Sequence, residues 1–545
     1  MKQTIHSILY FLALGTIAVT MTVSVWACNL AWVVLLANWV FDWVFASKEH
    51  RNSQLSAFRT NRLLQAFIVL FLLQVIGLLW TSNFDYALDA IRKSFPLLAV
   101  PMVLLSAHPL DDSRLGERMR PYFIGKNSNH RLLGNILFCY IMGIAASCTV
   151  GLIRYFTIPD LPYRKIVPFL SHIRFSLNLC LAIVLLVYQV IQSYRKQNQH
   201  IVRTLIALSL AGFFLGFLFL LQSYTGILIL AILFLLTVVG YGKYIPSRSL
   251  RQTLYGFSII GILGVIAISG YYINDYFHLK QLSREPLKEQ TINGNPYTHH
   301  QDRFIENGNY VLNYICDQEL EEQWPRLSNV HLDSLTPNGF PIRPTLYRYL
   351  NALGATKDSV GLTHLTAEDI TAIENGIANP VYQKTLSLKR MYFVMCYEFE
   401  SYRRYRSVKD FTMLQRIELW RTGIQVVAKH PLFGTGTGDV VDECHAQLAT
   451  NHSPLEGTTK HSHNQYLTFL ITYGIIGFGL ILFVFGRALL NRQLYHYYPF
   501  FAIVIIFLFS CLTEDTLETL AGDMFMALFF CLFYNQQNNQ NQLSQ

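Results

Sequence analysis

Long runs of apolar residues recur along most of this chain, and short polar stretches separate them. Each run is close to the roughly 20 residues that a helix needs to cross a bilayer. Hydropathy and length together predict about twelve spans and an all-α polytopic membrane protein. The predicted spans are residues 6–26, 29–46, 63–80, 94–107, 132–153, 172–193, 204–221, 225–241, 253–272, 464–486, 497–512 and 521–535.

One large polar region, residues 273–463, separates the ninth and tenth predicted spans. Its second half is predicted to be mostly helical, whereas residues 280–345 have scattered Asn, Gly and Pro and suggest no element. Thr366 and Asp369 form a capping-box start for one helix, and Gly376 is its expected stop. The pattern divides the chain into a membrane domain (1–272), a loop domain (273–463), a second membrane domain (464–536) and a disordered tail (537–545).

Two further helices are predicted near the end of the loop domain. Asn379 and Pro380 are suited to N-cap and N1, which predicts a helix reaching Arg406. The next helix is expected over residues 410–429, because Pro431 disfavours its continuation.

Loop charges orient the predicted spans. If the N-terminus is cytoplasmic, the cytoplasmic loops hold about 17 Lys and Arg, and the short outer loops hold about five. The even number of spans then places the C-terminus in the cytoplasm as well. Residues 273–463 are accordingly expected on the side of the membrane opposite the cytoplasm.

Composition agrees with a membrane protein and narrows its partners. Of the 545 residues, 52% are hydrophobic and 14% are charged. The formal net charge of +9 comes from basic residues clustered in short loops, which indicates membrane topology and contact with membrane lipids but no nucleic-acid partner. Cys316, Cys396 and Cys444 lie in the polar region and allow at most one disulfide among themselves, without requiring one.

The stretch from His461 to Gly477 joins the polar region to the tenth span. Ser462 and Gln465 have capping-box spacing, so we expect the helix to begin at Ser462, with His463 in its first turn. The helix dipole there disfavours imidazolium and favours a neutral His463 that accepts a proton. From this stretch alone, the favoured interpretation is an interfacial histidine that caps or reaches water and takes no part in chemistry.

Two arginines are candidates for binding an anion. Arg174 is predicted one turn inside the outer end of the sixth span, where a charge is costly and often functional, although an arginine near a helix end can reach water. Arg416 lies in the helix predicted over residues 410–429, with Trp420 on the same helical face at i+4.

That helix leads into a glycine-rich segment containing Gly434, Gly436 and Gly438. Such a segment can cradle a phosphate, but no strand precedes it, and a turn between helices is the favoured interpretation. Backbone amides at this turn could still help to bind an anion.

The remaining polar candidates are weaker. His461 and His463, with two more histidines nearby, lack the ligand spacing of a familiar metal site, so we predict no metal. Glu514, Asp515, Glu518 and Asp523 lie in the last outer loop. They could balance the arginines or orient a histidine, but a simple polar loop is the favoured interpretation.

Taken together, these motifs resemble the O-antigen ligase family of bacterial envelope enzymes, which is similar to O-antigen polymerases and protein O-oligosaccharyltransferases. The resemblance covers the twelve-span plan and the large loop before the third-last span. It also includes R-x-x-x-W at Arg416 and Trp420, P-L-F-G-x-G-x-G at 431–438, and H-x-H-N-x-Y-L at 461–467. The segment at 280–380 departs from the shorter loop that is common in the family.

The resemblance implies a function and a set of site residues. It implies glycan transfer from an undecaprenyl-diphosphate-linked donor, at the periplasmic face and without metal or cofactor. His463 matches the catalytic histidine of the family, and Arg174 and Arg416 match the two arginines expected to bind the diphosphate. The residues expected to support them are His461, Asn464, Trp420, Gly436 and Glu514.

The acceptor stays open at this point. O-antigen ligation to lipid A-core is the favoured function, and a polymerase or a protein O-oligosaccharyltransferase would use the same donor. A flippase for lipid-linked sugars is the non-enzyme alternative. A flippase would need charged residues near the membrane midplane, whereas the candidate residues gather near the outer face.

Overall fold

The computed structural model describes residues 2–543 except 108–127, 160, 196–200, 245–246, 285, 301–303, 385–386, 406–407, 409–411 and 459–461. The chain divides into two compact units. The first comprises Met1–Gly240 and Leu419–Gln545, and the second comprises Tyr241–Glu418. The first unit therefore contains residues 1–240 of the first expected membrane domain, all of the second, and residues 419–463 of the expected loop domain. Residues 241–272, which include the ninth predicted span, fall in the second unit.

Helices make up the first unit. Before the division point its helices are α1 (Lys2–Thr20), α2 (Val25–Phe45), α3 (Lys48–Thr60), α4 (Arg62–Ile76), η1 (Gly77–Trp80), α5 (Phe84–Ser94), α6 (Pro96–Met102), η2 (Val103–Ala107), α8 (Ser128–Thr157), η4 (Tyr163–Lys165), α9 (His172–Arg195), α10 (Ile201–Leu220) and α11 (Tyr224–Tyr241). After it come α20 (Val440–Thr450), α21 (Gln465–Leu489), η8 (Arg492–His496), α22 (Tyr498–Ser510) and α23 (Leu520–Leu543).

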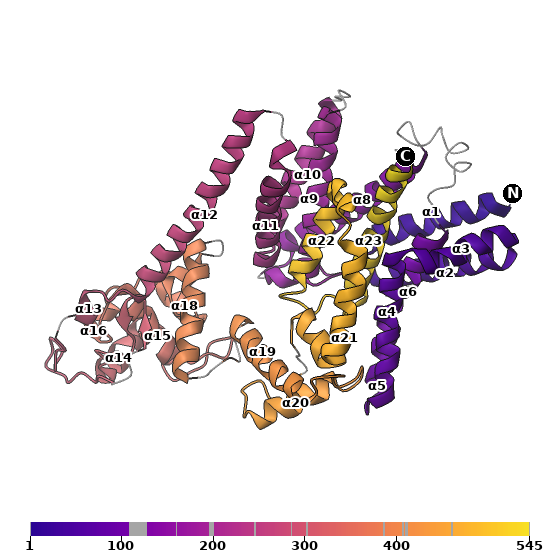
Figure 1. The fold of residues 1–545 in the computed structure, drawn as a ribbon. Coiled ribbons are helices and arrows are strands. Elements are labelled where there is room, and N and C mark those ends of the chain that lie inside the picture. The colour runs from indigo at the N-terminus through magenta and orange to yellow at the C-terminus, as the bar shows by residue number, and fades with distance from the viewer. Residues whose placement is uncertain are drawn as a thin grey trace. The chain divides into compact units, whose positions relative to one another are not determined.

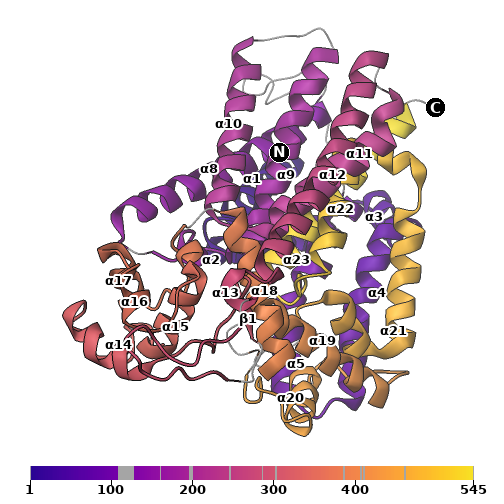
Figure 2. The same ribbon diagram turned by 90° about the vertical axis from the view of Figure 1, so that its left-hand side faces the viewer.

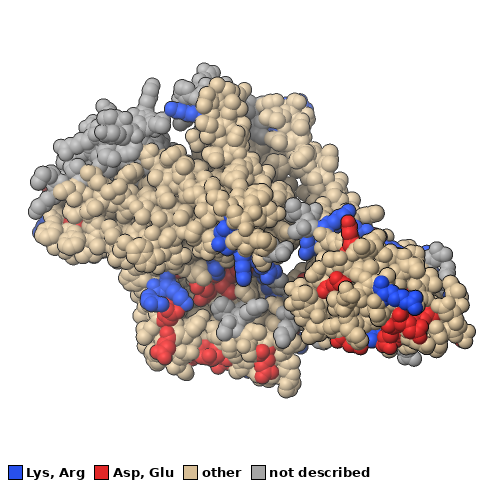
Figure 3. Space-filling model, turned by 180° about the vertical axis from the view of Figure 1, so that it is seen from behind, with Lys and Arg blue, Asp and Glu red and all other residues tan. Residues whose placement is uncertain are grey.

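The membrane character predicted from hydropathy is confirmed. Within the described residues, nine helices are long and apolar enough to cross a membrane, and Ile5–Thr20 and Tyr498–Ser510 are shorter apolar helices. Every predicted span coincides with a helix, although the number of helices that cross the bilayer stays a prediction. Figure 3 shows a broad surface without charged side chains, as expected for helices that face lipid.

Packing in the first unit brings distant segments side by side. Helix α4 packs along α21, and α9 packs along both α10 and α22 (Figure 1). Phe500, Phe529 and Phe530 are fully buried in the apolar core that these helices share. Helix α23 continues to Leu543, so the tail expected to be disordered is helical through that residue. Glutamine, which is frequent there, has a good helix propensity.

The second unit begins with η5 (Gly242–Tyr244) and α12 (Arg248–Phe277), the ninth predicted span. Its other elements are α13 (Gln281–Arg284), β1 (Ile305–Glu306), β2 (Asn309–Tyr310), α14 (Asp317–Gln323), η6 (Trp324–Arg326), α15 (Ile342–Leu353), α16 (Ser359–Leu362), α17 (Ala367–Glu374), η7 (Pro380–Gln383) and α18 (Leu388–Tyr405). Strands β1 and β2 form an antiparallel hairpin. Helix α19 (Thr412–Lys429) contains the division point between the units.

The second unit has its own core. Figure 2 shows α14, α15, α16 and α17 gathered in one cluster, in which Trp324 and Tyr349 are fully buried. The stretch 280–345, which suggested no element, folds partly through side-chain hydrogen bonds to the backbone. Asn351 Nδ2 donates to the carbonyl oxygens of Glu306 and Asn309 at 2.8 and 3.3 Å. Because bonds of this kind do not require apolar residues at regular intervals, no hydrophobic periodicity marks these elements in the sequence.

Two predicted helix boundaries in this region can be compared with the structure. The capping box of Thr366 and Asp369 is confirmed, and Gly376 has the positive φ of a stop, at 83°. The single helix expected from Asn379 to Arg406 is wrong. Asn379 caps only the short η7, and α18 begins separately at Leu388. The helix propensities of the residues after Asn379–Pro380 do not reveal where a helix is interrupted.

Helix α21 is broken at Gly474, where φ is 65° and ψ is −171°. The glycine-rich segment fills the break. The amides of Thr435 and Gly436 donate to the carbonyls of Ile471 and Thr472 at 2.8 and 3.0 Å. In the opposite direction, the amides of residues 475 and 476 donate to the carbonyls of residues 431 and 432. The backbone groups that the break exposes are thereby paired again, as an apolar environment requires.

Replacing Gly474 with alanine is expected to destabilise the protein. An added Cβ would lie 2.3 Å from the carbonyl oxygen of Leu432. The backbone at Gly474 also lies in a region that essentially only glycine adopts, which costs another residue about 1–3 kcal/mol. We expect a lower melting temperature in detergent, measured by scanning fluorimetry. Gly479→Ala is the matched control, because a Cβ there meets no atom within 4 Å. An equal loss in both variants would contradict the role of the break.

Candidate functional site

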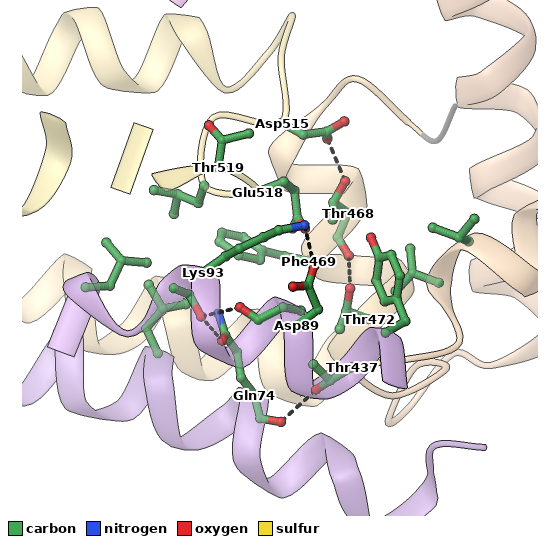
Figure 4. Close-up of a pocket in the computed structure, with 18 of the residues that line it drawn as sticks. Gln74, Asp89, Lys93, Thr437, Thr468, Phe469, Thr472, Asp515, Glu518 and Thr519 are labelled. Carbon is green, nitrogen blue, oxygen red and sulfur yellow. Dashed lines mark hydrogen bonds and ion pairs between the residues drawn. The ribbon is translucent and has the colours of Figure 1, made fainter. Parts of the chain in front are cut away.

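The first unit encloses a cavity of about 420 Å³. Its walls come from α4, α5, the start of α9, the glycine-rich segment, α21 and the loop between α22 and α23. Figure 4 shows lining residues of α4, α5, the glycine-rich segment, α21 and that loop. The polar or ionisable residues that line it are Gln74, Tyr86, Asp89, Lys93, Ser94, Arg174, Thr437, His463, Thr468, Thr472, Tyr473, Glu514, Asp515, Glu518 and Thr519. Three of the residues selected from the sequence, Arg174, His463 and Glu514, therefore share one cavity.

His463 lies immediately before Asn464, the N-cap residue of α21. The helix begins at Gln465 with Asn464 as its N-cap, so the predicted start at Ser462 is wrong. Asn464 Oδ1 accepts from the amide of Leu467 at 3.1 Å, which is the bond expected of an N-cap. His463 has a φ of 46°, a conformation that a histidine rarely adopts and that excludes this residue from the helix.

Ser462 does not cap the helix. Its hydroxyl instead bonds to the carboxylate of Asp515. The Ser462 hydroxyl donates to Asp515 Oδ1 at 3.2 Å, and the Asn464 amide donates to the same oxygen at 3.0 Å. Thr468 Oγ1 donates to it at 2.7 Å, as Figure 4 also shows. These bonds fix the carboxylate of Asp515, so the sequence Ser462–Asn464 serves to hold a carboxylate as well as to start a helix.

The fixed carboxylate faces His463. Asp515 Oδ2 lies 3.9 Å from His463 Nδ1, which is longer than a hydrogen bond but short enough for a strong charge interaction. Asp515 is almost fully buried, whereas the His463 side chain is 35% exposed toward the cavity. This arrangement suits a histidine that takes up a proton while a neighbouring carboxylate stabilises the imidazolium.

The loop that carries Asp515 is clamped to the start of α21. The Gln465 amide donates to the Cys511 carbonyl at 2.9 Å, and Gln465 Oε1 accepts from the Leu517 amide at 2.7 Å. The predicted capping role of Gln465 is therefore replaced by a role that positions the last outer loop. Of the acidic residues of that loop, Asp515 is placed 3.9 Å from His463.

Arg174 lies in the first turn of α9, and its side chain lines the same cavity. Its carbonyl accepts from Asn178 Nδ2 at 2.9 Å, which ties Asn178 to the same turn. The N-terminal end of a helix carries partial positive charge, so a cation in that position is unfavourable without an anion nearby. Arg174 and the end of α9 together provide a positive wall suited to an anionic group.

Helix α5 adds groups that were not selected from the sequence. Tyr86, Asp89 and Lys93 are spaced at i, i+3 and i+7, so one helical face carries all three toward the cavity. Lys93 Nζ lies 2.5 Å from Asp89 Oδ2 (Figure 4). The 3.6-residue spacing of polar residues along 86–93 is the sequence pattern that could have predicted this polar helical face.

The glycine-rich segment has a structural role in this site. Thr437 Oγ1 donates to the Gln74 carbonyl at 2.7 Å, and the Gly438 amide donates to Thr81 Oγ1 at 2.7 Å. Because the amide of Gly436 is bonded to Thr472, Gly436 supports the site through the position of the segment. The favoured interpretation of the segment, a turn between helices, agrees with these bonds.

The other candidates lie elsewhere. Arg416 is on α19 and belongs to the second unit, so its part in binding stays a prediction. Trp420, one turn further on, packs in the first unit against the cluster that contains Val426 and Leu467. His461 lies outside the described residues. Within the part of the chain that is described, no three His, Cys, Asp or Glu side chains are grouped to hold a metal ion.

Comparison with known proteins identifies one family. Residues 360–482 match the family model described as O-antigen ligase. The match includes the three motifs at 416–420, 431–438 and 461–467, so the resemblance predicted from these motifs is confirmed over that part of the chain. A comparison with curated proteins gave no match.

Proposed function

We propose, from the O-antigen ligase match and the contents of the cavity, that this membrane protein transfers a glycan from a lipid-linked diphosphate to an acceptor hydroxyl. The proposed donor is an undecaprenyl-diphosphate-linked glycan. The observation that carries the proposal is that Arg174 and the His463–Asp515 pair line one cavity, although more than half of the chain separates Arg174 from Asp515. The proposed location is the periplasmic face of a bacterial inner membrane, with both chain termini in the cytoplasm.

Each side chain of the site has a separate role in the proposed transfer reaction. His463 accepts the proton of the acceptor hydroxyl as its oxygen bonds to the anomeric carbon. The bond from that carbon to the diphosphate oxygen breaks, and its electron pair remains on the diphosphate. Arg174 stabilises this growing negative charge, with Lys93 as a second cation of the cavity. Arg416 is proposed to join them as a forked donor.

Attachment to lipid A-core is the proposed form of this transfer. A polymerase and a protein O-oligosaccharyltransferase would use the same donor and the same division of labour, so they are kept as alternatives. A flippase is less well supported, because a proton acceptor paired with a buried carboxylate serves group transfer and has no evident use in moving an intact lipid-linked sugar.

The purified protein tests this proposal directly. It is incubated with an undecaprenyl-diphosphate glycan and, in separate reactions, with lipid A-core, a second lipid-linked glycan, or an acceptor protein. A glycosylated product in the first reaction supports ligation, and a product in either of the others supports an alternative. Movement of the donor across a vesicle membrane without any covalent product would overturn the enzyme proposal.

Transfer is expected to continue after treatment with EDTA at neutral pH. The reason is that arginine and lysine side chains can supply the positive charge that a divalent cation supplies in other diphosphate-using enzymes. The rate is measured before and after treatment, and again after adding Mg²⁺ or Mn²⁺. A lost rate that either ion restores would show that the cations of the chain are insufficient.

Replacing Asp515 with asparagine is expected to slow transfer about tenfold to a hundredfold, with little change in donor affinity. The amide keeps an oxygen for its hydrogen-bond donors but loses the charge that stabilises imidazolium at His463. Initial rates at saturating donor provide the measurement. Asp442→Asn is the control and should keep the normal rate, because the Asp442 carboxylate accepts from Asn83 Nδ2 at 2.8 Å and does not line the cavity.

A further inference from the structure

Several buried polar atoms beside the cavity have no hydrogen-bond partner among the described residues. They are Arg174 Nε, Thr519 Oγ1 and both carboxylate oxygens of Asp523. Buried groups of this kind are nearly always paired in folded proteins, so a group of them in one place indicates bound water or a ligand. None of the functions assigned above uses Thr519 or Asp523.

Asp523 and Thr519 lie on one face of the start of α23. The Asp523 amide donates to the Thr519 carbonyl at 3.0 Å, which is the first helical hydrogen bond. Residues four apart on a helix are neighbours, so the two side chains lie one turn apart. Thr519 lines the cavity, and Figure 4 shows it on the same side as Asp515. Asp523 is one turn deeper and fully buried.

A carboxylate in that place needs a counter-charge. Removing an ion from water without a partner is strongly unfavourable. The charged groups near Asp523 include Arg174, of opposite sign, and Glu518, of the same sign. Helix α9, which carries Arg174, packs against α23. Within the described residues Arg174 and Asp523 form no direct ion pair, so a link between their side chains requires a bridging group.

We propose that Asp523 is a positioning residue for Arg174. Its carboxylate, through bridging water shared with Thr519, holds the Nε edge of the guanidinium. The two Nη groups are then left to face the cavity, where they form the fork that a diphosphate accepts. The inference rests on the proposed function, because it requires Arg174 to bind the donor.

A double-mutant cycle tests this proposal with the full-length protein in nanodiscs. Asp523→Asn, Arg174→Gln and the double variant are compared with the native protein for affinity toward undecaprenyl diphosphate. Asp523→Asn is expected to weaken binding about tenfold in the native background and to have almost no effect once Arg174 is glutamine. Asp42→Asn, at a carboxylate in a different part of the first unit, is the matched control and should bind normally.

Each outcome separates this inference from the proposed function. If the two single effects multiply in the double variant, Asp523 acts independently of Arg174 and the inference is overturned, while the role of Arg174 stands. If Arg174→Gln binds normally, both fail. If Asp523→Asn lowers the yield of folded protein, the same cycle is measured as melting temperature. Arg174→Gln must then restore stability by removing the uncompensated charge, and failure to restore it overturns the inference.

Discussion

Alanine in place of His463 is expected to lower the transfer rate about a hundredfold to ten-thousandfold, which is the usual contribution of a general base. Donor affinity should persist, because the proposed diphosphate contacts lie on other elements. The Asp515 carboxylate would remain in place, held by Ser462, Asn464 and Thr468, but would have no imidazolium to stabilise. Single-turnover rates at saturating donor measure the chemical step, and equilibrium binding of the donor is measured separately.

The control for this change is His430→Ala. His430 lies 3.7 Å from Glu443 and is therefore a second histidine near a carboxylate, but it does not line the cavity. Its replacement should leave transfer unchanged. A His463→Ala variant that is folded and transfers at a near-normal rate would show that another group accepts the proton.

Lysine in place of Arg174 is expected to weaken donor binding about tenfold, and glutamine about 10- to 150-fold, because charge-assisted hydrogen bonds of about 1.5–3 kcal/mol are lost. Lysine keeps the charge but not the planar fork. Since the charge on the diphosphate grows during bond cleavage, the rate at saturating donor should fall as well. Binding and single-turnover transfer are both measured for each variant.

Arg164→Gln is the matched control, because Arg164 is exposed, contacts the ring of Tyr163 and does not line the cavity. If Arg174→Lys behaves like this control in both measurements, Arg174 only reaches the membrane surface and has no part in binding.

The span plan was predictable because hydropathy depends on the residues of each helix alone. The family resemblance was predictable for a similar reason, since its three motifs are contiguous. The start of α21 was misplaced by three residues because two helix signals compete there. Ser462 satisfies the capping-box spacing, but its hydroxyl bonds to Asp515, and Asn464 takes the N-cap. The outcome of that competition depends on Asp515, which is 53 positions away from Ser462.

The composition of the cavity was only partly predictable. His463 and Arg174 each stood out by position, but their proximity depends on how α9 and α21 pack, and hydropathy does not specify packing partners. Lys93 was missed because it lies in a short amphipathic stretch before an apolar run. The break at Gly474 was also missed, because a glycine within an apolar run gives no sign that a distant segment will pair with the freed backbone groups.

The division into two compact units has an evolutionary consequence. Every residue that lines the cavity is encoded outside 241–418, so that interval can diverge or be exchanged without altering the His463–Asp515 pair. Arg416 lies just inside the interval, two residues before its end. Chimaeras that exchange residues 241–415 between related chains would thus keep all of the proposed reaction chemistry, and any change in their products would report the selectivity encoded by the exchanged interval.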